Sequence, residues 1–232
     1  VKKYLLVLLF LISLSCQSEK NENIETNKNN NPLVLSNDSD GDGITDDLDQ
    51  DNNTRVGVPV DDNGVMQNPI YLDENDVTVK AFEWSIKGDN GIFNEVIYTV
   101  VDEQTLLNMV SNDEDVTRIC TSKITLMTQL FYNKSTFNQD ISTWDTSNVN
   151  GRNFMFNSAE AFDQNISSWN TSNVQDMNYM IRNASSFNQT IRFWDASNVT
   201  IMRVMFTLAV SFNQTFLDLI FKIVYGPVSL YF

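Results

Sequence analysis

Three stretches decide the fold of this chain: FNQDISTWDTSNV at residues 137–149, FDQNISSWNTSNV at 162–174 and FNQTIRFWDASNV at 187–199. Each begins 25 residues after the one before it, and the same columns of residue types recur in every copy. Agreement at so many columns predicts four 25-residue repeats over residues 121–215. The aromatic columns are predicted to be the repeat core, and their members are Phe137, Phe162, Phe187, Phe212, Trp144, Trp169 and Trp194.

One such repeat cannot bury its apolar side chains alone, whereas neighbouring repeats that stack can do so, because each column then continues as a ladder. Asn148, Asn173 and Asn198 also keep the 25-residue register. An amide side chain carries both donors and an acceptor. We therefore predict that these three residues bond the turn backbone of the neighbouring repeat.

The WDTSNV motif, the apolar positions at three-residue steps that follow it, and the FNQ and Ile-Ser motifs make residues 66–215 similar to the BspA-like bacterial surface proteins. That family is leucine-rich-repeat-like. The resemblance implies a cell-surface protein engaged in adhesion or protein–protein contact, with no catalytic residues to carry over. The predicted fold is an α+β repeat protein: a short leucine-rich-repeat-like solenoid with a small β-rich N-terminal cap, preceded by a disordered tether.

Residues 66–120 are predicted to be that cap, a small unit of strands and one helix. The runs IYLDENDVTVKAF and GIFNEVIYTVVD have the β-branched and aromatic composition of strands, and the DNG motif at Asp89–Gly91 is a hairpin-turn signal. Asp102 is predicted to cap a helix through EQTLLNMV. The side chains expected on the inner face of this helix are Leu106, Leu107 and Val110.

Residues 38–53 read DSDGDGITDDLDQDNN and predict a calcium-binding loop. Calcium takes six to eight hard oxygen ligands, and the glycine at the sixth place of the loop permits a sharp turn. The predicted ligands are Asp38, Asp40, Asp42, Asp46, Asp49 and the backbone carbonyl of Ile44. With Asp at its twelfth place, the loop resembles a thrombospondin type 3 repeat more than a helix-flanked EF-hand. The alternative interpretation is an acidic solvated linker.

The N-terminus predicts export. Lys2 and Lys3 precede an apolar stretch that is too short to span a membrane as a mature helix, and Ser15 precedes Cys16. Residues 1–16 resemble a bacterial lipoprotein signal peptide, which implies lipidation of Cys16 and anchoring at the cell surface, in the outer membrane. An ordinary cleaved secretory peptide is the alternative. Residues 17–37 are rich in Asn, Glu and Lys, and are predicted to be a disordered tether.

Composition narrows the function classes. The net charge is −15, but from Thr121 onward seven acids balance seven bases, so the excess acid lies in the first 120 residues and no nucleic-acid partner is expected. The chain has no His, the commonest general base. We expect a binding scaffold for an extracellular protein or glycan, with no small-molecule substrate and no catalytic activity.

Two alternatives to a binding scaffold remain at this point. One is a structural spacer or a truncated fragment of a larger adhesin, because residues 216–232 replace the repeat motif with a run of large apolar residues. Those residues are predicted to be a degenerate or truncated end. The other is a glycan-active enzyme that uses paired acids, either Asp140 with Asp163 or Asp145 with Asp195.

Overall fold

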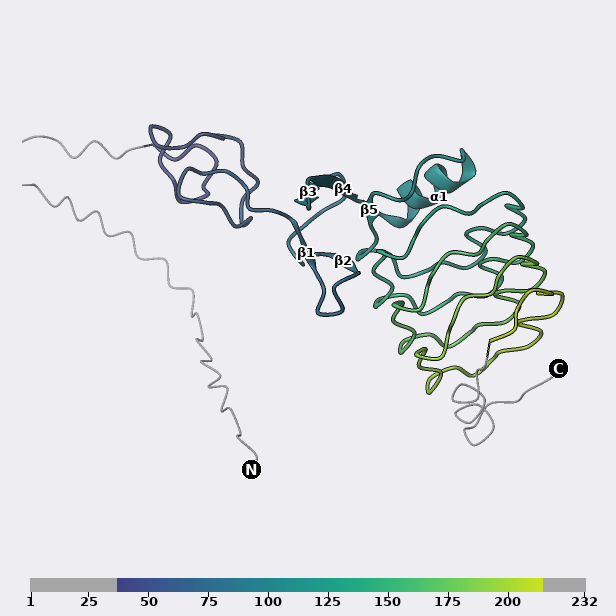
Figure 1. Cartoon of the computed structure of the whole chain (residues 1–232). Coiled ribbons are helices and arrows are strands. Elements are labelled where there is room, and N and C mark those ends of the chain that lie inside the picture. Colours follow the sequence, from purple (N-terminus) through teal and green to yellow (C-terminus); the bar gives the residue numbers. More distant parts are fainter. Residues whose placement is uncertain (1–36, 215–232) are drawn as a thin grey trace, which may run out of the picture. The chain divides into compact units, whose positions relative to one another are not determined.

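The computed structural model describes residues 37–214, so the predictions for Cys16, for most of the tether and for residues 216–232 lie outside the described residues. The unit that begins at Asp38 carries small sheets and a single described helix, all before the repeats (Figure 1). One sheet has the order β1-β2 and the other β3-β4-β5. The elements are β1 (Ile70–Leu72), β2 (Val79–Ala81), β3 (Asn90–Phe93), β4 (Val96–Val100), α1 (Glu103–Ser111) and β5 (Ile119–Cys120).

The β3–β4 hairpin turns later than the sequence predicts. Asn90, the middle residue of the DNG motif, already pairs with Thr99 inside the sheet. The turn is made instead by Asn94 and Glu95, whose φ angles are 47° and 64°. A two-residue type I′ turn needs positive φ at both positions, and Asn adopts that conformation more readily than most residues. The prediction of a turn at DNG is therefore wrong.

Helix α1 begins at the predicted cap. The Asp102 carboxylate accepts a hydrogen bond from the backbone N–H of Thr105 at 2.8 Å, which satisfies one of the free donors of the first turn. Leu106 and Val110 are buried, but Leu107 is 46% exposed, so the prediction that Leu107 faces inward is wrong. Residues four apart lie on one face of a helix, whereas the neighbour of Leu106 is turned by about 100° away from it.

The helix also covers the free edge of the first repeat. Glu103 Oε1 accepts hydrogen bonds from the backbone N–H groups of Thr125, at 3.0 Å, and Leu126, at 3.1 Å. In later repeats the N–H at the position of Thr125 bonds the preceding repeat, as Asn150 N–H does to the carbonyl of Thr125 at 3.1 Å. The Glu103 carboxylate thus takes the place of a missing preceding repeat.

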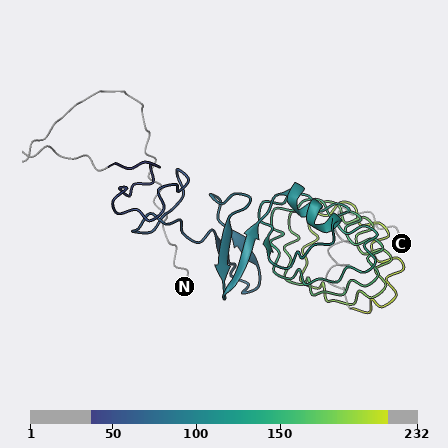
Figure 2. The ribbon, with the colours of Figure 1, turned by 90° about the horizontal axis from the view of Figure 1, so that it is seen from above.

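Successive repeats lie side by side and exchange backbone hydrogen bonds. The N–H of Phe131 donates to the carbonyl of Met155 at 2.9 Å, and the N–H of Phe156 donates to that of Met180 at 2.8 Å. Isolated parallel bridges join equivalent positions of successive repeats. These positions are Leu126, Gly151, Asp176 and Ile201. Figure 2 shows the successive turns of the chain overlying one another in this region.

The predicted α+β, leucine-rich-repeat-like solenoid is nevertheless wrong. Within residues 121–214 the described chain contains neither a helix nor a strand, and the regular structure of the described part consists of two small sheets and one short helix before the repeats. Tight turns replace regular elements in each repeat. The N–H of Trp144 bonds the carbonyl of Ile141, and the N–H of Phe162 bonds that of Ala159.

Two features explain why the repeats contain turns and not strands. Phe154 and Ser158 have φ of 58° and 62°, and the equivalent positions of the other three repeats are also left-handed, which interrupts any extended run. Asn and Asp side chains accept from backbone N–H groups two residues ahead, as Asp145 does from Ser147 at 3.0 Å and Asn170 from Ser172 at 2.9 Å. Such local bonds compete with a continuous ladder.

The aromatic columns lie in the interior of the repeat region. Trp144 and Trp169 stack with their ring centroids 6.3 Å apart. Each buried Trp donates its indole N–H to a carbonyl 28 residues earlier, as Trp169 does to Ile141 at 3.1 Å. Phe162 and Phe187 are fully buried, whereas Phe137 and Phe212 at the two ends of their column are partly buried. Trp194 is buried as well.

Among the described residues, no helix is long and apolar enough to cross a membrane.

Candidate functional site

The acidic segment folds around a group of three carboxylates. Ligand oxygens of Asp38, Asp40 and Asp42 all lie within 4.8 Å of one another. Gly41 and Gly43, with φ of 78° and 97°, bend the backbone so that their N–H groups donate to the two Asp38 oxygens, at 2.8 and 3.2 Å. A non-glycine residue rarely adopts these angles, so the glycines permit the approach of the three acids.

Two carboxylate oxygens near this group have no donor. Asp42 Oδ1 accepts the N–H of Ile44 and Asp49 Oδ1 accepts the N–H of Asp51, both at 2.8 Å, but Oδ2 of each is buried without a hydrogen-bond partner. Burying a charged oxygen without compensation is costly, and a bound cation removes that cost. A hard divalent cation with oxygen ligands is what this donor set fits, as calcium requires.

The electrostatics of Asp49 also favour a bound cation at this group. The N–H of Asp51 lowers the pKa of Asp49, but desolvation and the negative charges of Asp42, Asp40 and Asp51 together outweigh it and leave the pKa above its usual value. Charged groups that disfavour one another's ionised form are relieved by a cation placed among them. The carboxylate of Asp49 is thus electrostatically coupled to Asp40 and Asp42.

The other predicted ligands are engaged differently. Both carboxylate oxygens of Asp46 accept from Ser39, one from its N–H and one from its hydroxyl, at 2.8 Å each. Ile44 is half-buried, and its N–H bonds Asp42. The structure therefore groups Asp38, Asp40 and Asp42, couples Asp49 to them, and holds Asp46 through Ser39.

Residues after the predicted loop hold it in place. The N–H of Thr54 donates to Asp40 Oδ2 at 2.6 Å, and its buried hydroxyl donates to the carbonyl of Gly64 at 2.8 Å. A Cβ on Gly64 would lie 1.9 Å from Asp49 Oδ1, so Gly64 leaves the space that this carboxylate occupies. The Asp spacing of residues 38–49 does not predict this contact, because Thr54 lies beyond the last predicted ligand.

In the repeats, the recurring polar residues bond neighbouring repeats. Asp163 Oδ1 accepts from the N–H of Asn188 at 2.8 Å and from the side chain of Gln189 at 2.9 Å, which explains the FNQ motif. The predicted bonds of the Asn column are confirmed. Asn148 donates to the carbonyl of Ser122, at 2.8 Å, and Asn173 to that of Ser147, at 2.7 Å, and Asn198 continues the series to Ser172.

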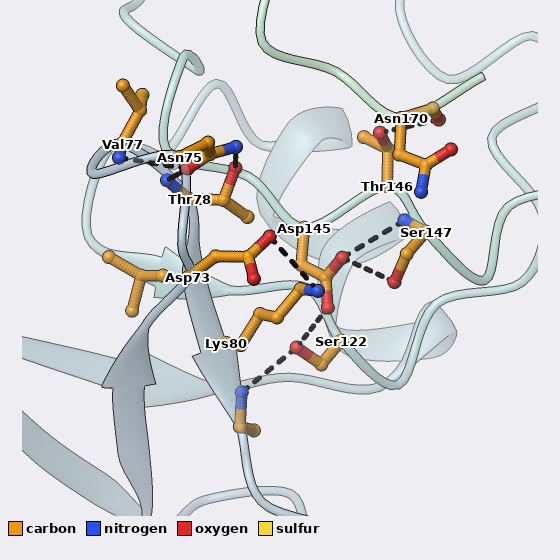
Figure 3. A network of polar contacts seen from close by, with 12 residues as sticks. Asp73, Asn75, Val77, Thr78, Lys80, Ser122, Asp145, Thr146, Ser147 and Asn170 are labelled. Atoms are coloured by element: carbon orange, nitrogen blue, oxygen red, sulfur yellow. Dashed lines mark hydrogen bonds and ion pairs between the residues drawn. The ribbon is translucent and has the colours of Figure 1, made fainter. Parts of the chain in front are cut away.

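A polar network joins the β1–β2 sheet to the first repeats (Figure 3). Asp145 is buried, and its Oδ2 accepts from the hydroxyl of Ser122 at 2.6 Å, while that hydroxyl accepts from the N–H of Ala81 at 2.9 Å. Lys80 pairs with Asp73 at 3.1 Å. Burial opposes protonation of Lys80, but Asp73 and Asp145 raise its pKa above its usual value. Every polar group named here therefore has a structural partner.

The acids of the enzyme alternative also serve local structure. Asp140 accepts the N–H of Ser142 at 2.9 Å, and Asp195 accepts that of Ser197 at 3.0 Å. Asp145 and Asp163 make the contacts already described. These are turn-forming and repeat-joining bonds, the roles that Asp commonly fills in tight turns.

The repeats contain one buried charge that the sequence patterns above do not predict. Arg152 is fully buried, and its Nη2 donates to the carbonyls of Thr146, at 3.2 Å, and Asn170, at 2.6 Å, while Nε and Nη1 have no partner. Burial lowers the pKa of Arg152 to about 9. The available signal was its place in the repeat, since the other three repeats carry Met127, Met177 and Met202 at this position.

Comparison with known proteins places the repeats in a family. The family model described as "Mycoplasma protein of unknown function, DUF285" matches residues 101–219, just over half of the chain. The chain belongs to this family. No curated protein and no solved structure matches it. The DUF285 match begins just before helix α1 and continues through the repeats, so the acidic segment lies before the DUF285 region. The match is in broad agreement with a surface repeat protein.

Proposed function

We propose that this DUF285 protein is an exported cell-surface lipoprotein, related to the BspA-like surface proteins, that binds an extracellular protein or glycan through its repeats. One observation carries the proposal: the recurring polar residues are used to bond repeat to repeat, as Gln189 does to Asp163 and Asn173 to Ser147. The recurring columns thereby maintain the framework, and the positions between them are free to differ from repeat to repeat. A scaffold with a variable surface is the arrangement that repeat proteins use for binding.

Binding by the intact chain tests this proposal. The full chain would be screened against immobilised extracellular matrix proteins and a glycan array, with an unrelated acidic protein of similar charge as control. Saturable binding to at least one class is the expected result. If no immobilised protein or glycan is retained above the control, the scaffold proposal fails and the structural-spacer alternative replaces it.

Anchoring at the cell surface forms a second part of the proposal. Cys16 would carry the lipid, and residues 17–37 would separate the folded part from the outer membrane. Growth with a radiolabelled fatty acid should label the wild-type protein and not a Cys16→Ser variant. The chain offers a matched control in Cys120→Ser, which removes the buried thiol and should leave the label in place. Equal labelling of the Cys16→Ser variant contradicts lipidation at this residue.

We further propose that the acidic segment binds calcium as a structural ion. Asp38, Asp40, Asp42 and Asp49 would supply carboxylate oxygens, with Asp46 and the carbonyl of Ile44 as the remaining predicted ligands. The unpartnered oxygens of Asp42 and Asp49 support this assignment. The ion would cancel the repulsion among these acids and fix the loop.

Calorimetry of the full chain tests the calcium proposal. We expect heat of binding at up to millimolar calcium, the range in which extracellular calcium modules bind. Asp42→Asn should weaken binding strongly. Asp62→Asn removes the same charge from an exposed residue outside the group and should leave binding unchanged. Absence of binding heat in the wild type reduces this segment to an acidic linker.

A further inference from the structure

Four residues from adjoining repeats form an aromatic strip at the surface: Tyr132, Phe154, Tyr179 and Arg182. The ring centroids of Tyr132 and Phe154 lie 6.3 Å apart, edge to face, and those of Phe154 and Tyr179 lie 4.6 Å apart in a stack. The Arg182 guanidinium lies 6.0 Å from the centroid of Tyr179. Tyr132 is 46% exposed, and the other three are half-buried, so the strip is open to solvent along one side.

The backbone under the strip is one that bulky residues rarely adopt. Phe154 and Tyr179 have φ of 58° and 56°, in the left-handed region where an aromatic side chain is unfavourable. Four residues further on, the same repeats use Ser158 and Asn183 at φ of 62° and 57°, and Asn suits that region. Aromatic rings thus occupy the first left-handed position in these two repeats, whereas the outer repeats carry Gln129 and Val204 there. Stacking of the two rings offsets part of the cost of their left-handed backbone. Stacking alone does not explain why these rings lie at the surface.

The charge of the strip is opposite to that of the whole chain. The three segments that carry it, 128–133, 153–158 and 178–183, contain no Asp or Glu and one Arg, Arg182, in a protein with net charge −15. Because Phe154 and Tyr179 face each other, their ring edges point outward, and the edge is the positive part of the aromatic quadrupole. Ring edges and a guanidinium together complement a partner that carries negative groups.

We infer that the aromatic strip binds a linear acidic glycan, one that carries carboxylate or sulfate groups along its length. The inference rests on the proposed binding function and names the surface and the partner class. Adjoining repeats present the strip residues one after another, which suits a polymer with a repeating unit. Arg182 would pair with an anionic group of the polymer, and the positive ring edges would lie against its oxygen atoms.

Binding of the full chain to four polymers tests the strip. The probes are heparin, polygalacturonate, neutral dextran and poly-glutamate, measured by calorimetry at low and high salt. We expect binding to heparin or polygalacturonate that weakens with salt, and none to dextran. Arg182→Gln should weaken it about tenfold, since a hydrogen bond to a charged group contributes roughly that factor. Tyr179→Asn should also weaken binding, and it should fold, because Asn accepts this φ.

The chain supplies a matched control in a second Arg–aromatic pair. The Arg192 guanidinium lies 4.6 Å from the ring centroid of Phe193, which is 69% exposed and occupies a different position in the repeat. The double variant Arg192→Gln/Phe193→Ser should bind as the wild type does. Wild-type affinity in Arg182→Gln and Tyr179→Asn overturns the strip while leaving the proposed binding function intact. Strip-dependent binding to poly-glutamate with equal affinity overturns the glycan assignment in favour of an acidic protein.

Discussion

At the scale of single residues, Arg152 is the clearest case of a side chain that costs stability. Its fully buried guanidinium has two carbonyl partners and lies 5.4 Å from the ring centroid of Trp169, but Nε and Nη1 have no hydrogen-bond partner. Replacing a poorly compensated buried charge by an apolar side chain of similar volume is often stabilising, by about 1–4 kcal/mol. Because Met occupies this position in the other three repeats, Arg152→Met is expected to raise the free energy of unfolding, measured in urea. A lower value for Arg152→Met would mean that the two carbonyl contacts outweigh the desolvation.

Phe162 is expected to behave in the opposite way. It is fully buried between Phe137 and Phe187, with ring centroids 5.9 and 5.8 Å away. Truncation of a buried Phe to Ala costs about 3–5 kcal/mol, through lost burial and the cavity that remains. Phe162→Ala should therefore lower the urea midpoint strongly. Phe193→Ala, at an exposed ring, is the matched control and should change the free energy of unfolding by less than about 0.5 kcal/mol. An unchanged midpoint in Phe162→Ala removes this column from the core.

At the scale of the element, helix α1 links stability to acid pH. The side chain and N–H of Thr105, followed by Lys87, lower the pKa of Asp102 from 3.8 to about 2. Because the pKa of Asp102 is lower in the folded state than in the unfolded state, its ionised carboxylate stabilises the fold above about pH 4. This stabilisation is lost as the pH falls towards 2. Asp102→Asn keeps an N-cap side chain without the titrating group. We expect the wild-type melting temperature to fall more steeply than that of Asp102→Asn between pH 4 and pH 2. Parallel curves would show that this cap does not carry the effect.

The elements also show what local sequence predicts well and what it does not. The cap at Asp102 was predictable, because the capping bond is made within one turn of the chain. The hairpin turn was not, because DNG and the Asn94–Glu95 pair compete, and the choice depends on which register places strand residues against the rest of the sheet. The absence of strands in the repeats escaped prediction for a related reason. A 25-residue period fixes which residues align from repeat to repeat, but it does not fix the backbone conformation between them.

At the scale of the whole molecule, the candidate sites also combine contacts that the sequence predicts with contacts that it does not. The acids of residues 38–49 could be predicted because calcium ligands follow a sequence spacing. The contacts that complete the segment, from Thr54 to Asp40 and from Gly64 beside Asp49, come from residues that no spacing rule includes. The aromatic strip could not be foreseen either, since Tyr132 and Phe154 occupy different positions in their repeats and meet across the repeat boundary.

The acidic segment and the repeats are held by separate contacts, which leads to a prediction for calcium removal. The ion would stabilise only the state in which Asp38, Asp40 and Asp42 converge, by about 2.7 kcal/mol when calcium is at 100 times its dissociation constant. The contacts between repeats involve none of these acids, and Arg55, which pairs with Asp89 at 3.0 Å, ties the acidic segment to the strands that follow it. Chelation should therefore loosen residues 38–66 and leave the repeats folded.

Limited proteolysis followed by mass spectrometry measures this directly. With chelator, cleavage should appear first within residues 38–66, while the fragment that contains helix α1 and the repeats persists. Asp42→Asn in the presence of calcium should give the cleavage pattern of the chelated wild type, and Asp62→Asn should give that of the calcium-bound protein. Early cleavage inside the repeats on chelation would contradict this prediction, because the described repeats are held together by bonds between their own backbones.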